Sequence, residues 1–350
     1  MHFSNKNDIF NNLFAFGALF FVFIHIPIVL LLMFQVKDFH KELLPLFLFA
    51  LGLPLLIISI TIIISTAFLY FYKVIFKSKD LSKLENKIEV RMQKTSKLRK
   101  DSYRKVCHIL IFIGLFIVWF ISYDFVKNNM SKKNEKPKIE PKTTNMLYLY
   151  LRLLTKPNSI KNVLFSLEWF YYILFFFFYS FTLIMLANEL TRKTRYLMFP
   201  FNFMKFLMYD EEKQKYGTYL FFTIGQMFAA FTCPPMVFFA ILGMSSIGDL
   251  ATSQIGMKFG KKHLSWNKKK SFEGALVGTF VSFVLCYFFV GFIYAAIFAL
   301  SFMCIDLFTR KPLNVSDNLL NPIGCALLFI FIRFGFDLDY NPIILYLLRI

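Results

Sequence analysis

Long apolar segments alternate with shorter polar ones along this chain. Leu44–Tyr72 and Trp169–Ala187 are two of the apolar segments, and a helix needs about 20 apolar residues to cross the hydrocarbon core of a bilayer. Polar residues do not alternate with apolar ones inside these segments, so the pattern does not indicate transmembrane β-strands. The pattern predicts an all-α fold, a polytopic transmembrane helix bundle with about eight or nine spans.

One of the expected spans is interrupted. The segments expected to span the membrane are 13–34, 45–72, 107–123, 166–188, 218–247, 274–290, 291–308 and 322–338. Segment 218–247 is long for one span and contains Pro234 and Pro235, so we expect two short or broken helices there. Because broken helices are tolerated at membrane depth where they line a cavity inside the protein, a cavity is predicted in this half of the bundle.

The polar segments divide the chain into three predicted regions. Residues 1–75 form an N-terminal transmembrane region, and its first apolar stretch is too long for a cleavable signal peptide. Residues 76–106 form a basic polar loop, and residues 107–350 form a second transmembrane domain with a polar insertion at 124–160. Basic stretches flank span 107–123 on both sides, so the positive-inside rule leaves the orientation of the N-terminal half open.

Composition argues against two classes of soluble site. The chain has 40 Lys and Arg against 21 Asp and Glu, but these charges lie in loops beside apolar segments, where they set topology and meet anionic headgroups. Nucleic-acid binding would need a solvated basic domain, and no polar segment is long enough. The cysteines form no CxxC pair and lie in or beside apolar segments, so packing is expected rather than disulfides or zinc. They are Cys107, Cys233, Cys286, Cys304 and Cys325.

The stretch from Ser245 to Gly274 contains the strongest candidate chemistry. It lies between two apolar segments and includes Asp249, a carboxylate that is costly there unless it is paired or binds a cation. If residues 248–260 are helical, a small polar face carries Asp249, Thr252, Ser253, Gly256 and Gly260. Backbone N–H groups of glycine turns and the lysines that follow suit phosphate oxygens, and Asp249 could hold Mg²⁺ together with substrate phosphates.

Simpler interpretations of the same residues remain open. The spacing of Gly256 and Gly260 is also a helix-packing pattern, and a run of lysines beside a span is a common topology signal. Taken together, the ordered set of an aspartate, glycines, lysines and a Glu-Gly pair favours a phosphate site.

This stretch resembles the signature of the CTP-dependent polyprenol and lipid kinases, which include dolichol kinase, phytol kinase and the CTP-using diacylglycerol kinases. The matching residues are Gly248-Asp249, Ala251, Ser253, Gly256 to Lys261, and Lys270 to Gly274. Three further elements are similar: Arg104-Lys105 with His108, Glu189 with Arg192, and Asp317-Asn318 with Pro322. One departure is Asp306, where the family often carries Glu.

The resemblance implies transfer of the γ-phosphoryl group of CTP to the hydroxyl of a membrane lipid alcohol: dolichol or another polyprenol, diacylglycerol or phytol. It implies catalytic roles for Asp249, His108, Glu273 and Asp317, and Mg²⁺ at Asp249 and Asp317. The implied nucleotide- and phosphate-binding residues are Arg104, Lys105, Gly256, Lys258, Gly260, Lys261, Lys269, Lys270, Ser271 and Asn318. The expected partners are CTP, the lipid alcohol and the bilayer itself, with no nucleic acid.

Several of these residues also have structural interpretations. Arg104 and Lys105 could snorkel to the membrane surface, His108 could hydrogen-bond a neighbour, and Asp317 could cap a helix. Glu189 could simply pair with Arg192 at a helix end.

Two other functions stay open. Phosphatidate cytidylyltransferases are related, but they carry a His-Gly-Gly run before Asp-Arg-x-Asp, and the nearest stretch here, Phe336 to Asp339, lacks it. A transporter or lipid-binding scaffold without enzymatic activity is the third possibility. As a kinase, the protein is expected in the endoplasmic reticulum membrane of a eukaryote or the plasma membrane of a prokaryote, with its active-site loops in the cytoplasm.

Overall fold

The described part of the protein is helical. The computed structural model describes residues 9–35, 43–75, 87–92, 94–131, 145, 148–149, 167–194, 208, 215–268, 270–309 and 315–347. Within those ranges the only β-type pairing is an isolated bridge between His263 and Ser271, which confirms the all-α fold. The main helices are α1 (Ile9–Phe23), α2 (His25–Gln35), α3 (Leu43–Ile75), α5 (Lys97–Ser131), α8 (Glu168–Thr194), α11 (Thr218–Thr232), α12 (Pro235–Gly243), η2 (Met244–Gly248), α13 (Asp249–Phe259), α14 (Phe272–Val290), α15 (Phe292–Phe308), α16 (Asp317–Gly335) and α17 (Ile343–Leu347).

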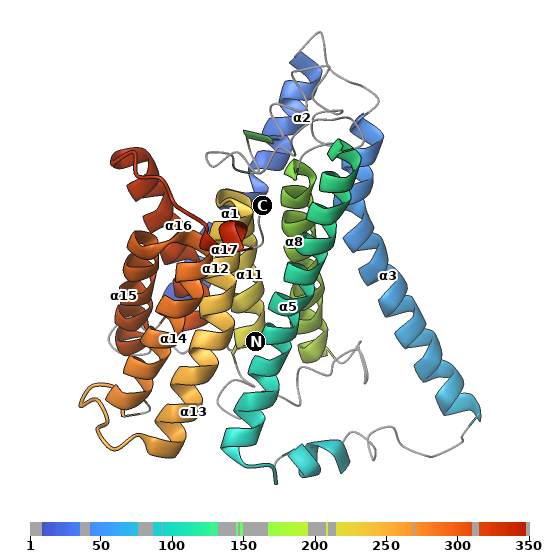
Figure 1. Ribbon diagram of the computed structural model, residues 1–350. Coiled ribbons are helices and arrows are strands. Elements are labelled where there is room, and N and C mark those ends of the chain that lie inside the picture. The colour runs from blue at the N-terminus through green and yellow to red at the C-terminus, as the bar shows by residue number, and fades with distance from the viewer. Residues whose placement is uncertain are drawn as a thin grey trace.

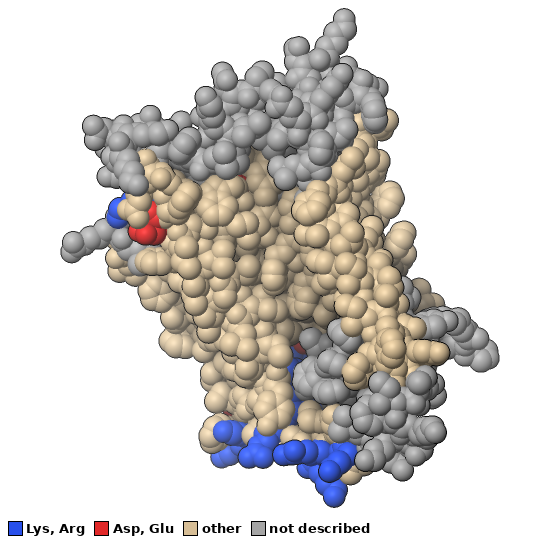
Figure 2. Space-filling model, turned by 90° about the vertical axis from the view of Figure 1, so that its right-hand side faces the viewer, with Lys and Arg blue, Asp and Glu red and all other residues tan. Residues whose placement is uncertain are grey.

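The chain is an integral, multi-pass membrane protein. Seven helical segments of the described residues are long and apolar enough to cross a membrane, and α15 is a shorter apolar helix beside them. Figure 2 shows a face whose broad middle is nearly free of charged side chains, with Lys and Arg gathered at its lower end and a smaller charged patch at its upper left edge. Apolar side chains on such a face are suited to contact with lipid. Together with the seven apolar helices, this face confirms the predicted polytopic bundle.

The expected break in segment 218–247 is present. Helix α11 ends at Thr232, Cys233 is extended, and Pro235 starts α12, where a missing N–H costs least. Every residue around this break is buried, and α12 continues through the π-helical turn η2 into α13. The prediction of two helices is confirmed; a cavity beside them stays a prediction.

Helix α5 is longer than the span expected at 107–123. It begins at Lys97 and runs to Ser131, so part of the predicted basic loop belongs to the helix. Local contacts explain the extension: Ser102 Oγ donates to Leu98 O at 3.0 Å, and Gln254 Nε2 of α13 donates to Ser102 Oγ at 2.9 Å. The basic residues 104 and 105 therefore lie on a helix that packs against α13.

The C-terminal helices form the compact part of the bundle. In Figure 1, α11 to α16 lie close together, α5 and α8 stand beside them, and α3 leans away at the right. Helix α12 is buried along its whole length, so it forms the centre of this part. Helix α3 meets α8, where Tyr179 Oη donates to Leu51 O at 3.2 Å.

A seam of small residues brings α13 and α14 together. A Cβ atom added at Gly274 would lie 2.6 Å from Thr252 O and 2.9 Å from Gly256 Cα. Both neighbours are backbone atoms, so the helices could not keep this spacing with any larger residue. Gly256 thus serves the helix-packing role that its spacing allows.

This seam predicts a difference between two glycine substitutions. Gly274→Ala should lower the free energy of unfolding by about 1–3 kcal/mol, because it overpacks a backbone contact. Gly114→Ala, at a helical glycine of α5 with no neighbouring atom within 4 Å, should be neutral or stabilising by up to about 1 kcal/mol. Thermal unfolding of both variants in detergent measures this, and equal melting temperatures would contradict the seam.

Candidate functional site

Three aspartates from different helices meet at one end of the bundle. Asp249 starts α13, Asp306 lies near the end of α15, and Asp317 starts α16. One carboxylate oxygen of each lies within 4.8 Å of the others. We call these residues the aspartate cluster. Asp306 is the most deeply placed member, with 1% of its surface exposed.

Two lysines neutralise part of this negative charge. Lys105 Nζ of α5 lies 2.9 Å from Asp249 Oδ2 and donates to Asp249 O at 2.8 Å. Lys270 Nζ donates to Asp306 Oδ1 and lies 3.4 Å from Asp317 Oδ2. Three carboxylates therefore face two ammonium groups, and the cluster with its two lysines keeps a net negative charge.

The position of Lys270 depends on a folded loop. Residues 260–271 connect α13 to α14, and this loop is tied to the end of α15. Trp266 Nε1 donates to Leu307 O at 3.2 Å, and Asn267 Nδ2 donates to Thr309 O at 3.2 Å. These contacts hold the loop against the helix that carries Asp306, so Lys270 faces the cluster and not the solvent.

The aspartate cluster shifts the titration of Lys270. Burial alone would lower the pKa of this ammonium group, but the carboxylates of Asp306, Asp317 and Asp249 raise the pKa above its ordinary value. Because the folded-state pKa is raised, the ion pairs are fully present below the ordinary lysine pKa. They are lost only as the pH rises through the higher folded value.

The donor atoms of the cluster suit a divalent metal ion. Carboxylate oxygens are the ligands that Mg²⁺ prefers, and Asp306 Oδ2 is buried with no hydrogen-bond partner among the described residues. Asp249, Asp306 and Asp317 could together hold such an ion, and the sequence predicts Asp249 and Asp317 as its ligands. Lys105 and Lys270 lie where they could contact phosphate oxygens beside it.

Other predicted site residues lie around the cluster. Arg104 donates to Thr218 Oγ1 at the start of α11. The ring of His108 stacks on Phe222 with 3.7 Å between centroids, and its Nδ1 is buried without a described hydrogen-bond partner. Asn318 donates its backbone N–H to Asp317 Oδ1 at 3.0 Å. The first two contacts link α5 to α11, and the third is local to the start of α16.

The remaining predicted residues lie in the connection between α13 and α14. Glu273 accepts from Lys262 N at 3.1 Å, and Ser271 Oγ accepts from Gly274 N at 3.2 Å as the N-cap of α14. Gly260 lies against Ser271, and Lys258 and Lys261 are exposed. Lys269 lies outside the described residues. Glu273 is not a member of the aspartate cluster, and its described contacts support the loop.

Glu189 joins two helices next to this site. It is fully buried and accepts from Arg192 Nη2 at 2.7 Å, from Gly217 N at 3.1 Å and from Tyr219 Oη. The pairing of Glu189 with Arg192 at a helix end, one of the two expected interpretations, is present. It ties the end of α8 to the start of α11, where Thr218 holds Arg104.

Asp306 is the member of the cluster that the sequence motifs do not include among the predicted metal ligands. Its sequence signal was a single carboxylate within an otherwise apolar segment, which indicates a functional position in a membrane helix. Asp101 is a second residue near the site that the sequence did not predict, because its Oδ2 lies 3.6 Å from Lys105 Nζ.

Comparisons with known proteins add no relative to which this site can be compared. No protein-family model, curated protein or solved structure matches the chain. The resemblance to lipid kinases therefore rests on the motifs and their spacing.

The charge balance of the site predicts the effect of removing one lysine. Lys270→Ala leaves Asp306 and Asp317 without their ammonium partner and should lower the free energy of unfolding by about 1–3 kcal/mol. Added Mg²⁺ should recover part of this loss, because a cation can take the place of the ammonium group. Lys268→Ala, at an exposed position of the same loop, should leave stability unchanged. Thermal unfolding with and without Mg²⁺ measures both variants; a loss that Mg²⁺ does not reduce would count against cation binding.

Proposed function

We propose that this protein is a CTP-dependent kinase that phosphorylates the hydroxyl of a membrane lipid alcohol. The observation that carries the proposal is the meeting of Asp249 and Lys270, from the signature stretch, with Lys105 and Asp317, from two other motifs. These motifs are far apart in the sequence, and a shared chemical task would explain why their charged residues converge. Phosphoryl transfer needs such a site, because positioning and charge neutralisation provide most of its catalysis.

The aspartate cluster would hold Mg²⁺, which neutralises charge on the nucleotide phosphates when it is bound. Lys105 and Lys270 pair with different members of the cluster and would contact phosphate oxygens in exchange for part of these ion pairs. The exposed Lys258 and Lys261 would attract the triphosphate toward the same end of the bundle. Nucleotide choice, CTP over other triphosphates, is supported by the motif resemblance.

In the proposed reaction, the lipid hydroxyl oxygen forms a bond to the γ-phosphorus of CTP. The bond between that phosphorus and the β–γ bridging oxygen breaks, and CDP leaves. The hydroxyl proton passes to a base of the site. His108, through its buried Nδ1, is the candidate for this base.

The proposal predicts a strong effect at one aspartate and none at a matched one. Purified protein in detergent, given Mg²⁺ and CTP labelled in the γ-phosphate, should label one of four lipids: dolichol, a shorter polyprenol, phytol or diacylglycerol. Asp249→Asn should reduce kcat about 100-fold or more, because it removes a carboxylate that would hold the Mg²⁺ and so weakens charge stabilisation at the phosphates.

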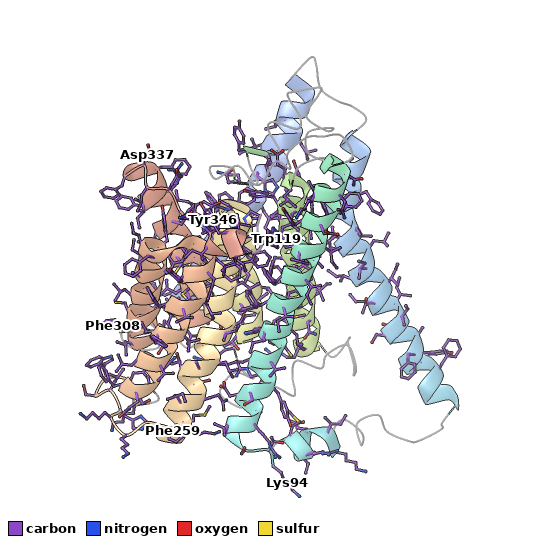
Figure 3. All side chains as sticks on the ribbon, in the orientation of Figure 1. Lys94, Trp119, Phe259, Phe308, Asp337 and Tyr346 are labelled. Carbon is purple, nitrogen blue, oxygen red and sulfur yellow. The ribbon has the colours of Figure 1, made fainter. Side chains whose placement is uncertain are left out.

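The control is Asp337→Asn at the opposite end of the bundle (Figure 3). Asp337 is 98% exposed and has φ +49°, a conformation that Asn tolerates, so this variant should keep the parent rate. Labelled CDP-lipid made from α-labelled CTP and phosphatidic acid, with release of pyrophosphate, would instead identify a cytidylyltransferase. Lipid binding without nucleotide turnover would identify a scaffold or transporter.

A further inference from the structure

A second group of polar side chains lies deeper in the bundle than the aspartate cluster. Gln226 of α11, Ser245 and Ser246 of η2, and Asn321 of α16 are between 0% and 4% exposed. Each has at least one side-chain oxygen or nitrogen that is buried and has no hydrogen-bond partner among the described residues. We call these residues the buried polar layer. Burying a polar group without a hydrogen-bond partner is unfavourable, so four such residues together call for a ligand.

The helix register places these residues at one level. Ser245 and Ser246 precede Asp249 by four and three residues, and Asn321 follows Asp317 by four. At a rise of 1.5 Å per residue, each lies about 4.5–6 Å further along its helix than the corresponding aspartate. A Cβ at Gly225 would lie 2.9 Å from Asn318 O and 3.1 Å from Pro322 Cγ, so the neighbouring Gln226 stands at the level of Asn321.

Helix α5 packs antiparallel to α12 and α13, and its contacts place His108 at the level of the buried polar layer. Ser102 contacts Gln254, Lys105 contacts Asp249, and a Cβ at Gly243 would lie 3.2 Å from Phe112. His108 therefore lies opposite η2, and it stacks on Phe222, one turn before Gln226 on α11. The layer thus continues inward from the aspartate cluster, toward the middle of the bundle.

The chemistry of the layer is that of a neutral ligand. Its members are amides and hydroxyls, which donate and accept hydrogen bonds and carry no charge. The cations that would bind phosphate, Lys105 and Lys270, are at the outer level. The π-helical turn η2 widens the backbone at the two serines, and such turns are frequent at functional sites.

We propose that the buried polar layer binds the neutral headgroup of the acceptor lipid, and that this lipid is a glycerolipid alcohol of the diacylglycerol type. This inference rests on the proposed function. In 1,2-diacylglycerol one ester group lies on the carbon next to the one that bears the hydroxyl, and the other lies one carbon further, so both would reach the layer when the hydroxyl is at the aspartate cluster. Gln226 Nε2 and the serine hydroxyls donate to the ester carbonyls. A polyprenol has only its hydroxyl and would leave the layer unpartnered.

The test compares two lipids on the purified full chain in detergent. Dioctanoylglycerol and a polyprenol of similar apolar size are each titrated while the melting temperature is followed. Dioctanoylglycerol should bind at least about 10-fold more tightly, the value of roughly one net hydrogen bond. Gln226→Leu should remove most of this preference. Because it deletes an unpartnered buried amide, it should not lower the lipid-free melting temperature, so a folding defect would be visible.

Thr223→Val is the matched control. Thr223 is equally buried on α11, but its hydroxyl donates to Leu220 O at 2.9 Å, so the variant should keep the lipid preference. Equal binding of the two lipids, or a preference that survives Gln226→Leu, would overturn the inference. Water would then be the ligand of the buried polar layer. Phosphoryl transfer is read separately with γ-labelled CTP. Layer-dependent binding of dioctanoylglycerol without labelled product would contradict the kinase proposal alone, and labelling of polyprenol in preference would contradict the layer alone.

Discussion

The cost of placing several carboxylates among apolar helices is the constraint on which this structure depends. Ionised groups in such surroundings are costly unless they are paired or bind a metal ion. The ammonium groups of Lys105 and Lys270 meet part of that requirement for the aspartate cluster. Because the partners come from α5, α13, α15, α16 and the loop after α13, satisfying these charges fixes where five segments of the chain meet.

The surrounding structure supports that meeting point. The glycine seam lets α14 approach α13, and the loop between them is tied to α15 through Trp266 and Asn267. The start of α16 is held from the far end of the sequence, where Asn11 Oδ1 of α1 accepts from Ser316 N at 3.1 Å. The N-terminal helix, outside the region of the motif resemblance, thus contributes to the place of Asp317.

The aspartate cluster and the buried polar layer differ in the charge of their side chains. Charged side chains gather at the level where the helices α13 and α16 begin, and neutral amides and hydroxyls lie one turn further in. This order matches a lipid alcohol whose reactive hydroxyl is its outermost group and whose remaining polar atoms lie closer to the tails. The proposed chemistry and the proposed substrate class are therefore linked through the same helices, α16 and the run from α12 to α13.

The sequence predicted the parts of this structure that depend on local patterns. Apolar length predicted the spans, and Pro234 and Pro235 predicted the break between α11 and α12, because both follow from backbone and bilayer physics. The continuity of α5 from Lys97 into the span was not predicted, because it depends on tertiary contacts with α13.

Within the site, the motifs singled out Asp249, Lys105, Lys270 and Asp317. Their mutual contacts, and the part played by Asp306, depend on long-range packing that no spacing encodes. The unpartnered state of Gln226 and Asn321 is likewise a property of the packed bundle, because their neighbours come from other helices.

Magnetic resonance of Mn²⁺ bound to the purified protein in the presence of CTP tests directly whether metal and nucleotide meet at the aspartate cluster. We expect one tightly bound Mn²⁺ with hyperfine coupling to the phosphorus nuclei of the nucleotide, and loss of that signal in Asp306→Asn. Tight binding that is unchanged in Asp306→Asn, or a bound ion without coupling to phosphorus, would show that the aspartate cluster is not the site where metal and nucleotide meet.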